Sequence, residues 1–316
     1  MLILLYGSKC HIFKCSLGTL NQMKNRVLVW LLMLWGFYSC ELPIADETDR
    51  IYSDTLQVGT YNVRISTPLD EDHRSWCFRR NYVALQIYTH GFDVFGIQEL
   101  LDQDQENDLK RLLPDFAFYV KGSGNDAGTY GQKIAIAWDK RRFEAQDSGF
   151  FFLSETPAVC SYGWDAENLH ICQWVRLHDT HNLKDFYYFN THLSCSGKEA
   201  RKNSVQLILE RINLLPEAIP VFLGGDLNAA PTETDTYAPL AANLSDSRVI
   251  AETDPEGFVG TFNNWDWMTY HFTEDRRIDY IFVRHVRVLR YQAINEQYVD
   301  DCWPSDHFPI RISVVL

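Results

Sequence analysis

Apolar stretches separated by polar turns run through most of the chain and predict many strands and a few helices. Residues 56–63 alternate apolar and polar side chains, as a half-buried strand does, and residues 92–97 form a continuous apolar run typical of a buried strand. Helical spacing of apolar residues predicts helices at 79–88, 103–113 and 198–214. Further strands are predicted at 116–120, 133–138, 148–153, 172–178, 186–192, 219–223, 278–284, 287–293 and 308–315.

This order of elements does not alternate strictly between strand and helix. It predicts an α+β protein with two packed sheets and helices outside them. The chain has 316 residues, of which 46% are hydrophobic and 14% are aromatic, enough to form a large core. Because no internal repeat, low-complexity tract or Gly/Ser-rich linker interrupts it, one large domain is expected rather than two small ones.

The first 40 residues have a different pattern, which resembles an export signal. A short basic start at 23–26 precedes a 12-residue apolar run at 27–38, which is too short to span a bilayer comfortably. A small residue before Cys40 resembles a bacterial lipobox, in which Cys40 would be lipidated; a cleaved signal and an uncleaved anchor are the alternatives. Residues 1–22 precede this signal, and a start codon assigned too early would explain them. The expected location is the cell envelope, as a membrane-anchored lipoprotein or a periplasmic or extracellular protein.

The chain is acidic, with a formal net charge of −13. Residues 1–40 hold four basic residues and no acidic ones, so their removal moves the charge to −17. Such a protein repels a polyphosphate backbone unless it has a local basic groove or bound cations, which disfavours long nucleic acid as a substrate. Cys160 and Cys172 flank a turn-rich segment and either pair or remain free thiols.

Two polar motifs near the C-terminus adjoin predicted strands. Gly-Gly-Asp-Leu-Asn at 224–228 directly follows the apolar run 219–223, and Ser-Asp-His at 305–307 directly precedes the strand at 308–315. Similar polar residues stand at or near the ends of other strands. The set comprises Asn62, Glu99, His192, Asp226 and Asp306. Loops at one end of a sandwich would bring these residues together, and hard-metal phosphoester sites are built from such side chains.

Six motifs in this order resemble the endonuclease/exonuclease/phosphatase superfamily, with its deoxyribonuclease-I-like fold. They are Thr60-Tyr61-Asn62, Gly96-Ile97-Gln98-Glu99, Asn190-Thr191-His192-Leu193, Gly225-Asp226-Leu227-Asn228, Arg277-Ile278-Asp279-Tyr280-Ile281 and Ser305-Asp306-His307. The resemblance covers residues 55–316 and implies a four-layer α/β/β/α sandwich of two packed mixed sheets, with residues 41–54 as a linker. Segments 152–157 and 197–201 are similar to the bacterial secreted or lipoprotein branch.

The resemblance implies a site for Mg²⁺ or Mn²⁺. Glu99 is an oxygen-only ligand at a strand end, and Mg²⁺ prefers one or two carboxylates plus waters. Asn62 either supplies a carbonyl oxygen or orients that ligand, and Asp306 is a further carboxylate on or near the metal.

The same resemblance assigns catalytic roles to five side chains. Asp226 is expected to position and deprotonate the attacking water, and Asn228 to hold water or phosphate through its amide. His192 and His307 are expected to bind the non-bridging phosphate oxygens and to stabilise charge in the transition state. Asp279 is expected to accept a hydrogen bond from His307, fixing its tautomer and favouring its cationic form.

Two further groups of residues are candidates for substrate contacts. Arg79 and Arg201 are candidate ligands of the substrate phosphate, although arginines on helix faces are more often solvated or ion-paired. Aromatic residues crowd segment 258–270, where Trp265 and Trp267 either line a rim that stacks on substrate or pack within the loop.

The predicted function is hydrolysis of a phosphoester by water that the metal and Asp226 activate, with a phosphodiester favoured over a monoester. The acidic charge favours a small or lipid-linked substrate over nucleic acid. A secreted deoxyribonuclease and a non-catalytic surface binding protein on the same fold are the alternatives. The expected partners are the phosphoester substrate and the membrane, through a lipid on Cys40; no obligate protein partner is indicated.

Overall fold

The computed structural model describes residues 54–101, 103–266, 272–298 and 302–316, which belong to one compact unit. The expected signal region with Cys40, residues 41–53 of the expected linker and Trp267 lie outside the described residues. Within the described part of the chain, no helix is long and apolar enough to cross a membrane.

Strands from both ends of the described chain form the first sheet, called sheet A here. Its spatial order is β11 (Arg287–Ala293), β12 (Ile310–Val315), β1 (Leu56–Asn62), β2 (Val94–Leu100), β4 (Lys133–Asp139) and β3 (Phe116–Gly122). Only the β1–β2 pair is parallel; the other neighbours run antiparallel. The parallel pair is joined through helix α2 (Trp76–Thr89), since parallel strands need a long crossover.

The second sheet, sheet B, is built from the middle of the chain. Its order is β5 (Phe143–Phe152), β6 (Ile171–Asp179), β7 (Lys184–His192), β8 (Val221–Asp226), β10 (Asp279–Arg284) and β9 (Ser245–Asp246). Here β7 and β8 are parallel and joined by helix α4 (Lys198–Asn213), so each sheet contains one parallel pair at its centre.

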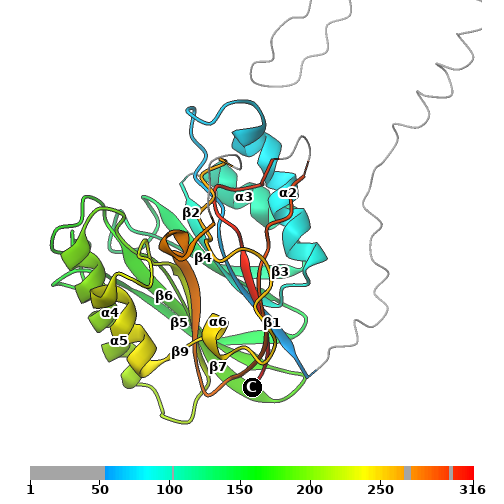
Figure 1. Cartoon of the computed structure of the whole chain (residues 1–316). Coiled ribbons are helices and arrows are strands. Elements are labelled where there is room, and N and C mark those ends of the chain that lie inside the picture. The colour runs from blue at the N-terminus through cyan, green and yellow to red at the C-terminus, as the bar shows by residue number, and fades with distance from the viewer. Residues whose placement is uncertain (1–53, 102, 267–271, 299–301) are drawn as a thin grey trace, which may run out of the picture. The chain divides into compact units, whose positions relative to one another are not determined.

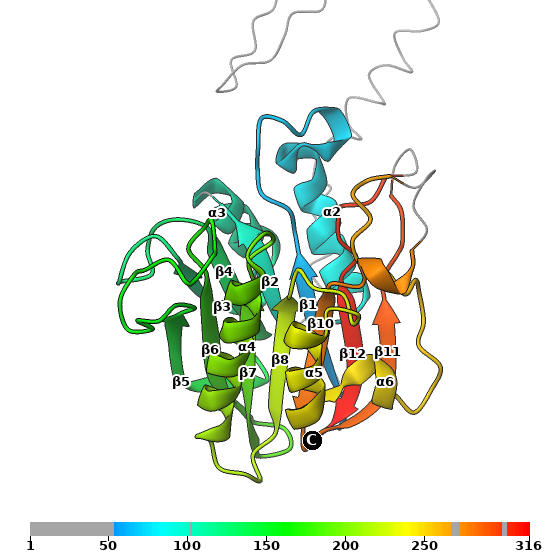
Figure 2. The same ribbon diagram turned by 60° about the vertical axis from the view of Figure 1, so that its left-hand side comes forward.

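The two sheets pack face to face, and helices cover their outer faces. Helices α2 and α3 (Gln103–Leu112) cover sheet A, whereas α4 and α5 (Thr234–Asn243) cover sheet B (Figures 1 and 2). Apolar side chains from both sheets, such as Val58 and Ile136 from A and Val175 and Phe222 from B, form the central core. The predicted four-layer α/β/β/α sandwich of mixed sheets is therefore confirmed.

The predicted elements differ from the structure at a few places. Helix α2 starts at Trp76, three residues before the predicted start. Strand β5 starts at Phe143, also before its predicted start; its first half is exposed and polar and therefore gave no apolar signal. Helix α5 was not predicted: it contains Pro239 and buries only Thr236 and Leu240, so its apolar periodicity is weak. The short elements β9, α6 (Ser247–Ile250), η1 (Asp72–Arg74) and η2 (Glu274–Arg276) also lacked a sequence signal.

Polar side chains cross the interface between the sheets near one end of the central strands. The Tyr188 hydroxyl on β7 donates to the carbonyl of Gly59 at 2.5 Å and accepts from the amide of Gly96 at 2.9 Å. Beside it, Asn190 Oδ1 accepts from Gln98 Nε2 at 2.7 Å. All five residues are buried, and unpaired polar groups are costly there.

Asn190 reaches furthest into sheet A. Its Nδ2 donates to the carbonyls of Ile97 and Ala135 at 3.0 and 2.8 Å. Gly96 allows this approach, because a Cβ at that position would lie 2.5 Å from Asn190 Oδ1. The network thus fixes the distance and register between sheets directly beneath the ends of β2 and β7.

Candidate active site

Strand register places three of the predicted site residues in one row across sheet B. His192 at the end of β7 lies opposite Asp226 at the end of β8, and Asp226 lies opposite Asp279 at the start of β10. Because neighbouring strands lie about 4.8 Å apart, such a row brings side chains of the same face into contact range. Asn62 and Glu99, at the ends of β1 and β2, face this row from sheet A.

A β-bulge directs Glu99 toward the row. The register between β2 and β4 shifts between Ile97 and Leu100, and Glu99 has a φ of 66°, a conformation that non-glycine residues rarely adopt. Burial alone would raise the pKa of Glu99, but His192, His307 and two hydrogen bonds outweigh it and leave the pKa below its ordinary value. Glu99 is therefore ionised at neutral pH.

Asn62 links the carboxylates of the two sheets. Its Nδ2 donates to Glu99 Oε1 at 2.9 Å and to Asp226 Oδ2 at 3.0 Å, while its Oδ1 accepts from the amide of Arg64 at 3.0 Å. Of the two roles expected for Asn62, this geometry corresponds to orienting the ligands rather than supplying a carbonyl oxygen.

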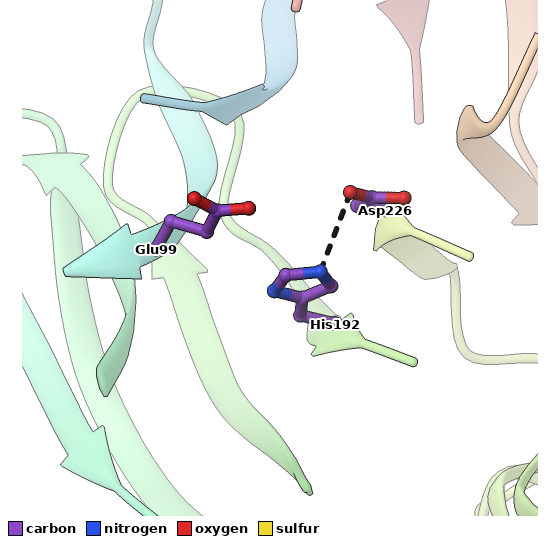
Figure 3. A group of neighbouring side chains, drawn as sticks. All are labelled: Glu99, His192 and Asp226. Carbon is purple, nitrogen blue, oxygen red and sulfur yellow. Dashed lines mark ion pairs between the residues drawn. The ribbon is translucent and has the colours of Figure 1, made fainter. Parts of the chain in front are cut away.

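Asp226 stands at the centre of the site and is almost fully buried. Its Oδ2 lies 3.4 Å from His192 Nε2 and 3.8 Å from His307 Nε2, and its Oδ1 accepts from the amide of Asn228 at 2.8 Å. Figure 3 shows Asp226 and Glu99 on either side of His192, from different strands. Burial, and next the charge of Asp279, raise the pKa of Asp226 despite the two histidines. A raised pKa makes the carboxylate a stronger base.

His307 and Asp279 form the expected pair. His307 Nδ1 lies 2.9 Å from Asp279 Oδ2, which also accepts from the Thr261 hydroxyl at 2.6 Å. Burial opposes the charged imidazole, but Asp279 and Asp226 prevail and hold the pKa of His307 well above its ordinary value. The ring is an imidazolium that donates from Nδ1 to Asp279 and presents its Nε2–H on the side of Asp226.

Asn228 and His170 hold His192. Asn228 Nδ2 lies 3.0 Å from His192 Nε2 and donates to the carbonyl of Leu193 at 2.9 Å. His170 Nδ1 donates to the carbonyl of His192 at 2.8 Å, which leaves the His170 lone pair on Nε2. Burial, assisted by the neighbouring His192, lowers the pKa of His170 to about 4, so this ring is neutral.

Asp306 lies beside the row rather than in it. Its Oδ2 is 3.5 Å from Nη1 of Arg64, and the preceding Ser305 donates its hydroxyl to the carbonyl of Asn62 at 2.7 Å. Burial is the main cause that raises the pKa of Asp306 to about 6, and Glu99 adds to it. The structure therefore places Asp306 near Glu99 in a site with an excess of negative charge.

The donor set fits a divalent cation. Potential ligand atoms gather in two groups, and within each group all of them lie within 4.8 Å of one another. One group consists of Glu99, His192 and Asp226, and the other of Asp226, Asp279 and His307. Asp279 Oδ1 is buried without a hydrogen-bond partner. The buried Asp226, with its raised pKa, and the unpaired oxygen of Asp279 would both be stabilised by a cation that prefers oxygen ligands, as Mg²⁺ and Mn²⁺ do.

The structure contradicts the expected substrate contacts of two arginines. Arg79 is fully buried, and its guanidinium donates to backbone carbonyls. Arg201 is also buried; it pairs with Glu233 through Nε and Nη2, each at 2.8 Å, and its Nη1 donates to the carbonyl of Ser194 at 2.8 Å. All five N–H groups of Arg79 are bonded to backbone carbonyls, and the guanidinium of Arg201 is buried against Glu233, so neither side chain is placed to contact a substrate phosphate and this prediction was wrong.

Several residues that support the site were missed in the sequence. Gln98 and Asn190 stand within the quoted motifs, directly before Glu99 and two residues before His192, and their position was a usable signal. Thr261 and His170 had none, since they contact the site from distant loops. Trp265 is half-buried and donates from Nε1 to the carbonyl of Trp303 at 3.2 Å, as a packed loop residue does. Cys160 and Cys172 are free thiols.

Comparisons with known proteins bear on the family and the fold. The model of the Endonuclease/Exonuclease/phosphatase family matches residues 59–307, within the predicted domain. The mannosyl-6-phosphatase of Bacteroides thetaiotaomicron VPI-5482 is 33% identical, with a TM-score of 0.77 over 83% of this chain and 100% of that chain. A family protein from Bacteroides vulgatus is 29% identical, with a TM-score of 0.76 over 83% and 99% of the two chains.

A more distant likeness extends to the fold alone. TDP2 of D. rerio, solved with a single-strand DNA product, is 18% identical, with a TM-score of 0.67 over 83% of this chain and 99% of that chain. No curated protein sequence matches. The match to most of the chain and the assembled motifs show that the chain belongs to the endonuclease/exonuclease/phosphatase family.

Proposed function

We propose that the protein is a Mg²⁺- or Mn²⁺-dependent phosphoesterase in which Asp226 activates the attacking water. The observation that carries this proposal is the position of the Asp226 carboxylate, buried between His192 and His307 with a raised pKa. A base with that environment accepts a proton from water more readily than an exposed aspartate does. Family membership supports hydrolysis of phosphoester bonds as the reaction class.

The remaining side chains have complementary roles. The His307 imidazolium, held by Asp279, donates from Nε2 to a phosphoryl oxygen and stabilises the negative charge that develops there. Asn228 Nδ2 donates to Nε2 of His192 and holds that ring beside Asp226. Asn62 keeps Glu99 and Asp226 in place.

The metal would be held by Glu99 together with Asp306, which lies close enough to Glu99 for the two charges to interact. When bound, it neutralises these carboxylates and polarises a phosphoryl oxygen. Arg64 pairs with Asp306 at 3.5 Å and keeps that carboxylate beside the site.

For the substrate we propose a small or lipid-linked phosphodiester, which the acidic charge favours over nucleic acid. A sugar phosphate monoester is a second candidate, because the relative at 33% identity is a mannosyl-6-phosphatase. The deoxyribonuclease alternative has weaker support, since the likeness to TDP2 concerns the fold alone. The binding-protein alternative is disfavoured because base, histidines and carboxylates are all present and assembled.

We further propose that the protein is exported, belongs to the secreted or lipoprotein branch, and is anchored through a lipid on Cys40. The support for this is the basic start, the apolar run 27–38 and the small residue before Cys40. Metabolic labelling with a radioactive fatty acid would test it, with Cys40→Ala as the control that should lose the label.

The experiment that tests the function measures hydrolysis of bis-p-nitrophenyl phosphate, p-nitrophenyl phosphate and mannose 6-phosphate with EDTA, Mg²⁺ or Mn²⁺. Turnover should require the metal and fall by about 10²–10⁴-fold in Asp226→Asn, the size of a general-base contribution. Near-normal turnover of a folded Asp226→Asn variant would remove Asp226 from the mechanism. The preferred ester decides between the two substrate candidates.

A further inference from the structure

One buried guanidinium bonds three segments of the chain, two of which adjoin residues of the candidate metal site. Arg79, on α2, has no exposed surface. Its Nε donates to the carbonyl of Arg74 at 2.6 Å, its Nη1 to those of Val63 and Pro304 at 2.7 and 2.8 Å, and its Nη2 to that of Arg64 at 3.2 Å. All of these acceptors are backbone carbonyls.

No ion pair between Arg79 and a carboxylate is found among the described residues. A buried charge without such a partner is costly to desolvate, and an apolar side chain at that place would avoid the cost. The position therefore needs the directed donors of a guanidinium, which are arranged in a rigid planar fork. The peptide groups that accept from these donors therefore indicate the function of Arg79.

Two of the carbonyls belong to peptide groups whose N–H groups face the metal site. The peptide between Val63 and Arg64 accepts from Arg79 at its carbonyl and donates to Asn62 Oδ1 at 3.0 Å through its N–H. The next peptide, between Arg64 and Ile65, accepts from Arg79 at 3.2 Å and donates to Glu99 Oε2 at 3.0 Å. Each planar peptide thus links Arg79 on one side to a site residue on the other.

This segment needs to be held. Arg64 has a φ of 60°, in the left-handed region that costs a non-glycine residue about 1–2 kcal/mol. Gln105 on α3 assists, because its Nε2 donates to the carbonyl of Arg64 at 2.8 Å and its Oε1 accepts from the amide of Ser66 at 3.1 Å. A cation on the carbonyl side also polarises the peptide and strengthens its N–H as a donor to Glu99.

The segment that contains Pro304 also carries Asp306, the remaining carboxylate near the site. The Pro304 carbonyl accepts from Arg79 at 2.8 Å, directly before Ser305, whose hydroxyl donates to the carbonyl of Asn62, and before Asp306. Arg79 therefore sets the orientation of the chain on both sides of the site, around Glu99 and before Asp306.

We propose that Arg79 is a positioning residue for the divalent cation, acting through the two peptide groups that hold Asn62 and Glu99 and through the segment before Asp306. The inference rests on the proposed function insofar as that function requires a metal. It predicts that the arrangement of the guanidinium donors, and not only a positive charge on α2, sets the metal affinity.

The test measures Mn²⁺ binding to the protein by isothermal titration calorimetry, with Arg79→Lys as the variant. A lysine ammonium keeps the charge but offers three donors from one point and cannot span the carbonyls of all three segments. The Mn²⁺ dissociation constant should rise at least 10-fold. Arg80→Lys is the matched control: the neighbouring side chain pairs at the surface with Asp108 at 2.8 Å, and its change should leave the constant within twofold.

A merely structural role would lower the free energy of unfolding in EDTA and leave the Mn²⁺ affinity of the folded protein unchanged, and that result would overturn the proposal. If Arg79→Lys does not fold, Gln105→Met removes the other side-chain donor to the Arg64 carbonyl from a different helix. It should weaken Mn²⁺ binding in the same direction, and unchanged affinity there would also overturn the proposal.

The binding assay separates this inference from the proposed function. A wild-type protein that binds no Mn²⁺ overturns both. Equal Mn²⁺ affinity of the wild-type protein and the Arg79→Lys variant overturns only the role of Arg79. Mn²⁺ binding that depends on Arg79 supports the positioning role even when no tested ester is hydrolysed.

Discussion

The pair formed by Asp279 and His307 makes the pH dependence of the reaction predictable. Asp279 accepts from His307 Nδ1 at 2.9 Å and is the first of the charges that raise the pKa of His307. After burial, Asp279 is also the first cause that raises the pKa of Asp226. Replacing Asp279 by asparagine removes this charge and should therefore lower both pKa values.

The two groups set opposite limbs of the pH–rate profile. In the proposed mechanism Asp226 must be deprotonated to act as a base, so it governs the acid limb. His307 must be protonated to stabilise charge, so it governs the alkaline limb. A hydrogen bond to a charged group contributes about 1.5–3 kcal/mol, which corresponds to about 1–2 pKa units at 1.36 kcal/mol per unit. The alkaline limb of Asp279→Asn should therefore move to lower pH by about 1–2 units. The acid limb should move in the same direction, so the whole profile shifts.

The assay is kcat/KM for the preferred ester between pH 5 and 10 at saturating metal. Asp185→Asn is the matched control, because Asp185 also bonds a histidine Nδ1, that of His178 at 2.7 Å, but at the partly exposed opposite end of β7. Its profile should coincide with that of the wild type. A profile of Asp279→Asn that is lower at every pH, with both limbs in place, would refute the electrostatic role of Asp279. The two limbs are compared as apparent pKa values of the whole site.

Two further predictions concern stability, measured by urea unfolding in EDTA. Tyr188→Phe should lower the free energy of unfolding by about 1–3 kcal/mol, because it leaves the carbonyl of Gly59 and the amide of Gly96 without this buried partner; no loss would show that the hydroxyl is dispensable. His170, whose pKa in the folded protein is about 4, should destabilise the protein on acidification, since the unfolded chain takes up the proton first. The free energy of unfolding is unaffected by this titration above pH 6.5 and should be lower by about 3 kcal/mol below pH 4. In His170→Gln the free energy of unfolding should fall less between pH 7.5 and pH 5 than in the wild type.

The strands and their polar ends could be predicted because both depend on local pattern. Alternation at residues 56–63 and the apolar run 219–223 mark strands, and Asp226 and His192 directly end theirs. Once the fold is known, parallel register between β7 and β8 places these two residues side by side. The order of motifs along the chain was therefore sufficient to identify the fold and the central part of the site.

The supporting interactions could not be predicted because they depend on contacts between distant segments. The bulge at Glu99 adds one residue to a strand and does not alter the apolar pattern of β2. Arg79 has the sequence context of an ordinary helical arginine, yet its acceptors include Pro304, 225 residues away. Thr261 reaches Asp279 across 18 residues from a loop with no regular pattern. Sequence reasoning therefore located the side chains that meet at the candidate site but assigned Arg79 the wrong partner.

The site exists only while the two sheets are packed, and this couples its chemistry to the fold. Asn62 Nδ2 bonds Glu99 of sheet A and Asp226 of sheet B, so carboxylates from both sheets meet across the interface. Their repulsion acts to separate the sheets at this end, whereas Tyr188 and Asn190, directly beneath, hold them together through hydrogen bonds between the sheets. An apolar interface at that depth would resist separation without fixing the register. A bound cation relieves the same repulsion, so metal binding and packing of the sheets stabilise each other by linkage. The polar layer beneath the site is thus the part of the core that keeps the carboxylates of the two sheets assembled in the folded protein.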